Sequence, residues 1–138
     1  MSARADKKRG VNYIRADATK MDFTRYKDST VLIKWMLCHL TDTAAVQLLS
    51  ALGDQGCRVY VVESCCAKSK PSRGKDEPFY ERTESCWSEL AMKARMQLAL
   101  IWRERLPGLA QQACFHLERK ESEVKVVPVP NNKRSTKQ

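Results

Sequence analysis

The segment from Thr30 to Glu63 constrains the fold most, because it is apolar and nearly free of charge. It contains an apolar run from Val31 to Leu40, a segment with helical periodicity from Thr41 to Leu52, and a second apolar run from Cys57 to Val62. In the middle segment, apolar residues recur every three or four positions, which is typical of one helix face packed on a core. The pattern therefore predicts two parallel strands joined by a helix in a right-handed crossover.

A second helix is expected from Glu84 to Arg105, where an apolar stripe recurs with helical spacing. A parallel pair needs cover on both faces and one helix covers only one, so this helix is expected to supply the second layer. Beyond it, Ala113–Leu117 and Val124–Val129 predict a hairpin, and a helix over Leu109–Lys120 is the alternative. The predicted class is α/β (or α+β): a mixed sheet of about four to five strands with two packed helices, in the order β-α-β-α-β-β.

The chain of 138 residues is long enough for one hydrophobic core. We expect a disordered basic arm over residues 1–10, a single globular domain over residues 11–130, and a disordered basic tail over residues 131–138. Within the domain, residues 65–78 are rich in Pro, Ser and Lys and predict a long basic loop. Val11–Ala16 could form a short edge strand.

The sequence contains neither an apolar run of about 18 residues nor the apolar stretch of a secretory leader near its start. These features predict a reducing, cytoplasmic location. The six cysteines are then expected to be buried small hydrophobes or free thiols rather than disulfide partners.

Charge is the feature that bears most on function. Lys and Arg total 25 against 16 Asp and Glu, which gives a net charge of +9. Residues 1–29 carry +4, residues 67–83 carry +2 and residues 107–138 carry +3, whereas residues 30–66 carry −1. Basic segments around a neutral scaffold raise the local concentration of polyanions. The distribution therefore favours nucleic-acid binding.

The candidate nucleic-acid contacts are basic residues of the loop, of both chain ends and of one flank of the second predicted helix, with two aromatic residues that could stack on bases. They are Lys68, Lys70, Arg73, Lys75, Phe79, Tyr80, Arg95, Arg103, Lys7, Lys8, Arg9, Lys133 and Arg134. The predicted function is a non-enzymatic accessory protein that binds RNA or single-stranded DNA, although no known nucleic-acid-binding motif occurs. The alternative is a protein-interaction module, an inhibitor or adaptor that docks on an acidic protein partner.

A second alternative is a thiol or zinc enzyme. Cys38 and His39 are expected just before a helix N-terminus, which is a setting that lowers the pKa of a thiol, but adjacent residues in a strand point opposite ways. Cys114 and His116 would share one face of a strand, yet no pair of cysteines has the spacing typical of zinc sites. With no glycine-rich phosphate-binding loop either, we assign no metal, no cofactor and no catalytic residue from the sequence.

Overall fold

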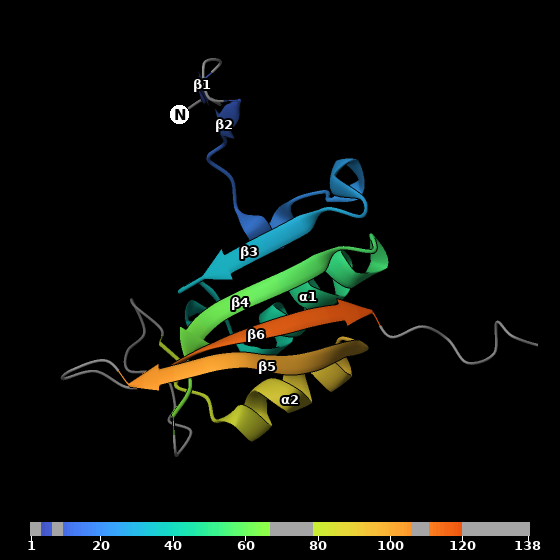
Figure 1. Cartoon of the computed structure of the whole chain (residues 1–138). Coiled ribbons are helices and arrows are strands. Elements are labelled where there is room, and N and C mark those ends of the chain that lie inside the picture. The colour runs from blue at the N-terminus through green and yellow to red at the C-terminus, as the bar shows by residue number, and fades with distance from the viewer. Residues whose placement is uncertain (1–3, 7–9, 67–78, 106–110, 120–138) are drawn as a thin grey trace, which may run out of the picture.

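The structure, a computed structural model, describes residues 4–6, 10–66, 79–105 and 111–119. Its main sheet has four strands in the order β3-β4-β6-β5 (Figure 1). β3 and β4 are parallel, and β6 is antiparallel to both β4 and β5. The elements are β3 (Thr30–Lys34), α1 (Asp42–Asp54), β4 (Arg58–Ser64), α2 (Glu84–Lys93), β5 (Met96–Arg105) and β6 (Gln111–Arg119). The predicted fold class is confirmed, and the order of these elements is again β-α-β-α-β-β, although its last two strands are not the two that were predicted.

The strand–helix–strand unit forms as its sequence pattern predicts. The side chain of Thr41 accepts a hydrogen bond from the N–H of Ala44 and caps α1, and Asp42 lies in the first turn near the positive end of the helix dipole. The apolar face of α1 is buried against the sheet. Its members are Ala45, Leu48, Leu49 and Leu52. The β3 strand is shorter than the predicted apolar run, because the chain turns at Trp35 and then forms a 3-10 turn, η3 (Leu37–His39).

The predicted helix over Glu84–Arg105 is wrong in its second half. α2 ends at Lys93, Arg95 takes a left-handed backbone conformation with a φ of 62°, and the chain returns as β5. Apolar residues in this stretch fit both a helical and an extended pattern, and pairing with β6 along the whole of β5 stabilises the extended one. Ala113–Leu117 is a strand as predicted, within β6, but it pairs with β4 and β5. Its predicted partner, Val124–Val129, lies outside the described residues.

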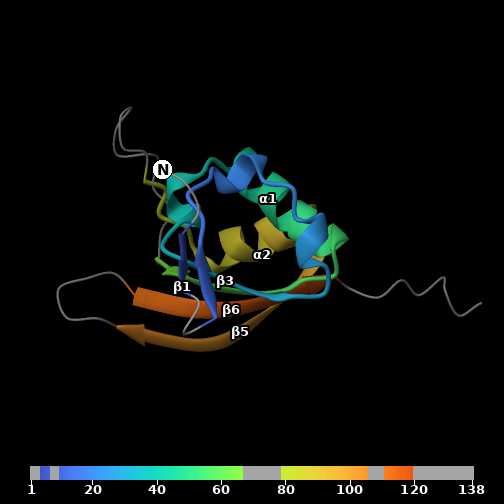
Figure 2. The ribbon, with the colours of Figure 1, turned by 90° about the horizontal axis from the view of Figure 1, so that it is seen from above.

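Both helices pack on the same face of the sheet (Figure 2), so the prediction that the second helix covers the second face is wrong. The chain direction explains this. β3, β4 and β5 all run the same way, and the chain moves across the sheet from β3 to β4 and then past β6 to β5. Two right-handed crossovers that advance in one direction place their helices on one face. The hydrophobic core lies between that face and the two helices, with Phe115 and Leu49 fully buried.

The N-terminal part forms a separate hairpin. β1 (Arg4–Asp6) pairs with β2 (Val11–Tyr13), and this pair stands away from the main sheet on the β3 side (Figure 1). The expected strand at Val11–Ala16 is therefore shorter and does not join the main sheet. The chain returns through the 3-10 turns η1 (Ala18–Lys20) and η2 (Thr24–Tyr26), and Phe23 packs against the core. No helix among the described residues is long and apolar enough to cross a membrane.

Candidate functional site

The turn after β3 has the most unusual backbone at the carboxyl edge of the parallel strands. Trp35 has a φ of 56°, and its side chain is 37% exposed. Its N–H donates to the carbonyl of Val62 at 3.0 Å, which holds the turn against β4. Such a backbone costs a non-glycine residue about 1–3 kcal/mol. Ligands of open α/β sheets bind outside the carboxyl ends of the strands, so we take the Trp35 turn (residues 35–39) as the candidate site.

A buried carboxylate supports this turn. Glu63, on β4, is fully buried, and its Oε2 accepts the N–H groups of Met36 and Leu37, both at 2.7 Å. Its Oε1 has no hydrogen-bond partner among the described residues. Burial raises the pKa of Glu63, and the N–H of Leu37 and the Cys38 thiol oppose part of this rise. Glu63 therefore fixes the backbone of the Trp35 turn.

The thiol at Cys38 is not an activated nucleophile. Cys38 is almost completely buried, and this burial, followed by the negative charge of Glu63, raises its pKa to about 12. A thiol with that pKa is protonated at neutral pH and unreactive. Asp42, which the sequence places nearby, forms an ion pair with Arg82. The burial of Cys38 therefore gives no support to the predicted alternative of a thiol enzyme at Cys38 and His39.

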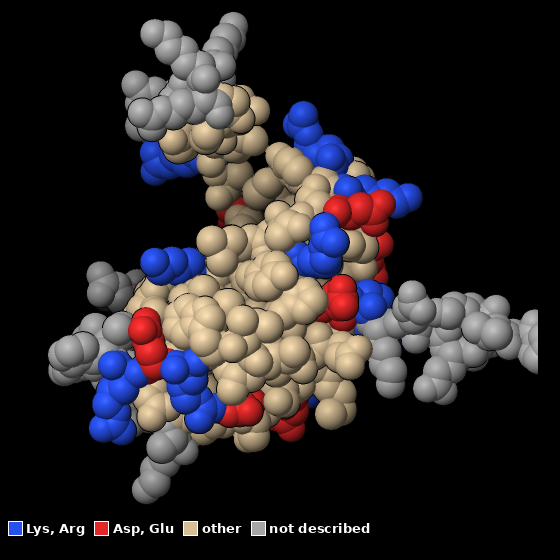
Figure 3. Space-filling model, in the orientation of Figure 1, with Lys and Arg blue, Asp and Glu red and all other residues tan. Residues whose placement is uncertain are grey.

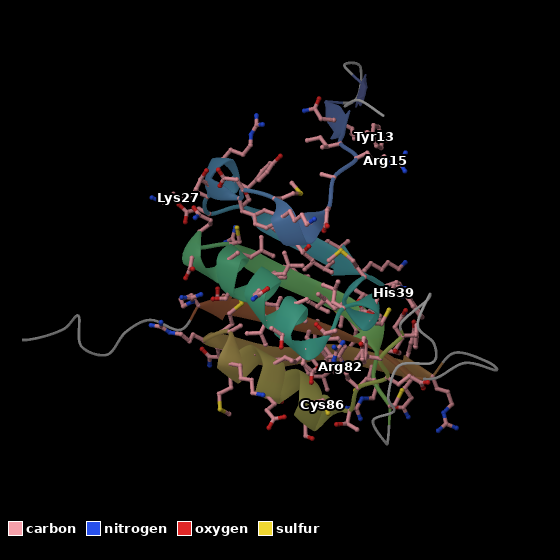
Figure 4. All side chains as sticks on the ribbon, turned by 180° about the vertical axis from the view of Figure 1, so that it is seen from behind. Tyr13, Arg15, Lys27, His39, Arg82 and Cys86 are labelled. Carbon is pink, nitrogen blue, oxygen red and sulfur yellow. The ribbon has the colours of Figure 1, made fainter. Side chains whose placement is uncertain are left out.

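Arg82 is the main connection between the Trp35 turn and the rest of the molecule. Its buried guanidinium donates to the carbonyls of Leu37 and Leu40, at 2.8 and 2.7 Å, and to the carboxylate of Asp42. It also lies over the rings of Tyr80 and Trp87, at 5.4 and 5.3 Å from their centroids. Figure 4 shows Arg82 between the start of α1 and α2. One side chain thus joins the turn, the α1 N-terminus and the segment before α2.

Nine of the thirteen predicted nucleic-acid contacts lie outside the described residues. They are Lys7, Lys8, Arg9, Lys68, Lys70, Arg73, Lys75, Lys133 and Arg134. The other four do not form one surface. Phe79 lies edge-on to His39 with ring centroids 5.6 Å apart, and the Tyr80 ring lies against Arg82. Arg95 is at the end of α2, whereas Arg103 is on β5 and forms an ion pair with Glu84.

The described part of the chain is nearly neutral. It carries 13 Lys and Arg against 12 Asp and Glu, for a net charge of +1, while the whole chain carries +9. On the face shown in Figure 3, basic and acidic side chains alternate around the rim and the centre is uncharged. This face of the described residues is therefore not strongly positive.

The described residues contain no group of three or more His, Cys, Asp or Glu side chains that could hold a metal ion. The sequence had singled out Cys114 and His116 as possible ligands. Cys114 is buried in β6, and the ring of His116 stacks on Tyr60 with centroids 4.8 Å apart. Packing within the sheet therefore accounts for the positions of Cys114 and His116.

Sequence reasoning missed the three residues that define the site. Trp35 looked like part of a strand, and its left-handed backbone has no signal in the sequence. Glu63 is a carboxylate at the end of an apolar run, which is the one cue that could have indicated a buried acid. Arg82 looks like any basic residue before a helix cap, because its acceptors lie about 40 residues earlier in the chain.

No protein-family model matches the sequence, and no curated protein matches it. Several solved structures with a similar fold are methyltransferases. A SAM-dependent methyltransferase from Leishmania major superposes with a TM-score of 0.62 at 16% identity, over 77% of this chain and 44% of that protein. The 1,6-didemethyltoxoflavin-N1-methyltransferase of Burkholderia thailandensis gives 0.62 at 16% identity, over 82% and 54%. Human N-acetylserotonin methyltransferase gives 0.58 at 16%, over 81% and 35%.

The chain thus has the fold of part of these enzymes and spans about half their length or less. This result contradicts the predicted function, a non-enzymatic nucleic-acid-binding accessory protein, because these three structures of similar fold are methyltransferases, which are enzymes. The prediction failed because it relied on net charge. Most of that charge lies outside the described fold, and charge reports on solubility and association rather than on fold.

Proposed function

We propose that this chain forms part of a SAM-dependent methyltransferase and that the Trp35 turn helps to position the methyl acceptor. The observation that carries the proposal is the similarity of its sheet and helices to several enzymes of that class. The location of the turn adds to it, because the carboxyl ends of β3 and β4 are where an open α/β sheet binds ligands.

The residues of the site are suited to binding and orienting an acceptor. Trp35 offers an exposed aromatic ring at the edge of the sheet, held by a strained backbone. Glu63 and Arg82 fix the backbone that follows Trp35, through hydrogen bonds to Met36 and Leu37. Because the backbone of the turn is already ordered, little backbone entropy is lost when an acceptor binds against the ring, which is how positioning residues assist a reaction.

The described residues do not provide a site for the SAM cofactor itself. A nucleotide-cofactor site of this fold type uses a glycine-rich turn after a strand and a carboxylate at the end of the next strand. Here the turn after β3 contains Trp35 and no glycine, and the carboxylate of Glu63 is turned inward onto that same turn. The N-terminus of α1 is occupied by its Thr41 cap and the Asp42–Arg82 ion pair. We therefore derive no catalytic step that involves the cofactor.

Methyl transfer provides the test. The full chain is added to an undenatured cell extract with SAM labelled in its methyl group, and label in protein, nucleic acid and small molecules is compared with extract alone. We expect added label, and we expect Trp35→Ala to reduce it about 10-fold or more, because small errors in positioning have large effects on rate. Arg58→Ala is the control, since Arg58 is exposed and lies at the opposite end of β4. No added label in any fraction would contradict the proposal.

A further inference from the structure

The outer edge of β3 is unpaired among the described residues. β3 is an edge strand of the main sheet, and its inner side pairs with β4. The N–H of Arg58 donates to Ser29, and the N–H of Trp35 donates to Val62. In a parallel ladder, successive residues point their backbone groups alternately toward and away from the partner strand. These two bonds show that residues 29 and 35 point toward β4, so the N–H and carbonyl groups of Leu32 and Lys34 point away from it. No backbone hydrogen bond on that outer side joins β3 to another described residue.

No helix among the described residues covers the sheet face opposite α1 and α2. Strand register places Leu32, Tyr60, His116 and Ala99 in one row across this face, and Lys34, Val62, Cys114 and Trp102 in the next. Leu32 is 66% exposed, and Ile101 and Trp102 are exposed at the β5 side. Figure 3 shows this face as a broad uncharged area with charges at its rim. We call these two rows, with Ile101, the open face.

Parallel strands are normally covered on both faces, because their side chains are apolar on both. β3 and β4 follow that pattern in sequence, with Ile33 and Val61 on the helix side and Leu32, Tyr60 and Val62 on the open face. The helix side is buried, whereas on the open face Leu32 and Trp102 are exposed and Val62 and Cys114 are buried. An unpaired edge beside exposed apolar side chains such as Leu32 is typical of a surface that binds another polypeptide segment.

Handedness indicates the kind of segment that fits. The two crossovers of this chain advance from β3 toward β5 and place both helices on one face. A right-handed crossover that advances the other way, outward from β3, places its helix on the opposite face. The rule holds for strands of one polypeptide, so it applies to a partner that pairs a parallel strand with β3 and then crosses outward to a second strand of its own, which places its helix on the side of the open face. Such a β-α-β unit would satisfy the outward N–H and carbonyl groups of Leu32 and Lys34 and bring apolar side chains toward Leu32.

A second copy of this chain fits less well. Two β3 edges related by a two-fold axis would pair as antiparallel strands and extend the sheet, but both open faces would stay uncovered. Solved structures of similar fold also favour an additional segment over a second copy. In the Leishmania major protein 56% of the chain, and in the Burkholderia thailandensis protein 46%, lies outside the region that this chain matches.

We propose that the outer edge of β3 and the adjoining open face form a docking site for an α/β partner polypeptide, which pairs a parallel strand with β3 and packs an apolar helix over Leu32. This inference goes beyond the proposed function, and docking is measured without methyl transfer, so either can fail while the other stands.

The test uses the full chain labelled with ¹⁵N and a synthetic strand peptide of alternating valine and threonine as the probe. We expect the peptide to slow hydrogen exchange at the amides of Leu32 and Lys34 about 10-fold or more at saturation. The amides of Val31 and Ile33 are the internal control, because they already donate to β4. A peptide that is N-methylated at alternate residues, and so cannot form the ladder, should give no protection.

The face is tested with a matched pair of variants. Leu32→Lys should weaken peptide binding about 10-fold, because it removes one apolar contact beside the edge. Met92→Lys on α2 is the control, since Met92 is 73% exposed on the opposite side of the sheet. Two results would overturn the proposal. One is unchanged exchange at Leu32 and Lys34 with millimolar peptide. The other is protection of these amides in the free chain, which means that the edge is covered by the chain itself or by a second copy.

Discussion

Replacing Arg82 with alanine should lower the free energy of unfolding by about 3 kcal/mol, measured by urea denaturation with tryptophan fluorescence. The variant leaves the carbonyls of Leu37 and Leu40 without their donor, and each unsatisfied buried acceptor costs about 1–3 kcal/mol. The lost contacts with the rings of Tyr80 and Trp87 add about 1 kcal/mol. The ion pair contributes less, because the Asp42 side chain is 69% exposed and stays hydrated.

The matched control for Arg82 is Arg58→Ala. Arg58 is exposed and donates one side-chain hydrogen bond, to the hydroxyl of Thr30, so its removal should change the unfolding free energy by about 0.5 kcal/mol or less. Arg82→Lys should fall between the two, because an ammonium keeps the charge but cannot donate in the planar fork geometry of arginine. Equal stability of the Arg82→Ala and Arg58→Ala variants would contradict the role given to Arg82.

The parts of the fold that could be predicted are those determined by local pattern. α1 has a cap, an acidic first turn and an apolar stripe within 13 residues, so every signal needed to place it is close in sequence. β5 could not be predicted in the same way. Its residues satisfy a helical stripe as well as an extended one, and pairing with β6 over its whole length, which no local window contains, decides between them.

The site depends on contacts between distant parts of the chain. Glu63 bonds to residues 26 and 27 positions earlier, and Arg82 to residues 40 to 45 positions earlier. No sequence motif marks either contact, so residue type alone could not distinguish Glu63 and Arg82 from the other charged residues. The functional error had a related cause. Charge can be counted from sequence, but whether it lies on one face depends on the fold, and the described fold carries a net charge of only +1.

Glu63→Ala should lower the free energy of unfolding by about 2–4 kcal/mol, because the buried N–H groups of Met36 and Leu37 lose their only acceptor among the described residues. Glu63→Gln should behave differently. A glutamine oxygen can still accept both N–H groups, and its amide replaces the uncharged form of the carboxyl without titrating. The two variants therefore separate the hydrogen-bonding role of Glu63 from the effect of its charge.

The direction in which pH changes the contribution of Glu63 to folding stability can be predicted. Burial raises the native pKa of Glu63 above the ordinary value of 4.5, so the folded state binds its proton more tightly than the unfolded chain does. The contribution of Glu63 to stability is therefore largest below about pH 4.5 and falls as the pH rises through the native pKa. Compared with wild type, Glu63→Gln should gain relative stability as the pH is raised from 4.5 to 8, because it lacks this loss. Urea denaturation of both proteins at several pH values across this range measures the difference. A constant difference between wild type and Glu63→Gln across the range would show that the pKa of Glu63 is not raised in the folded state.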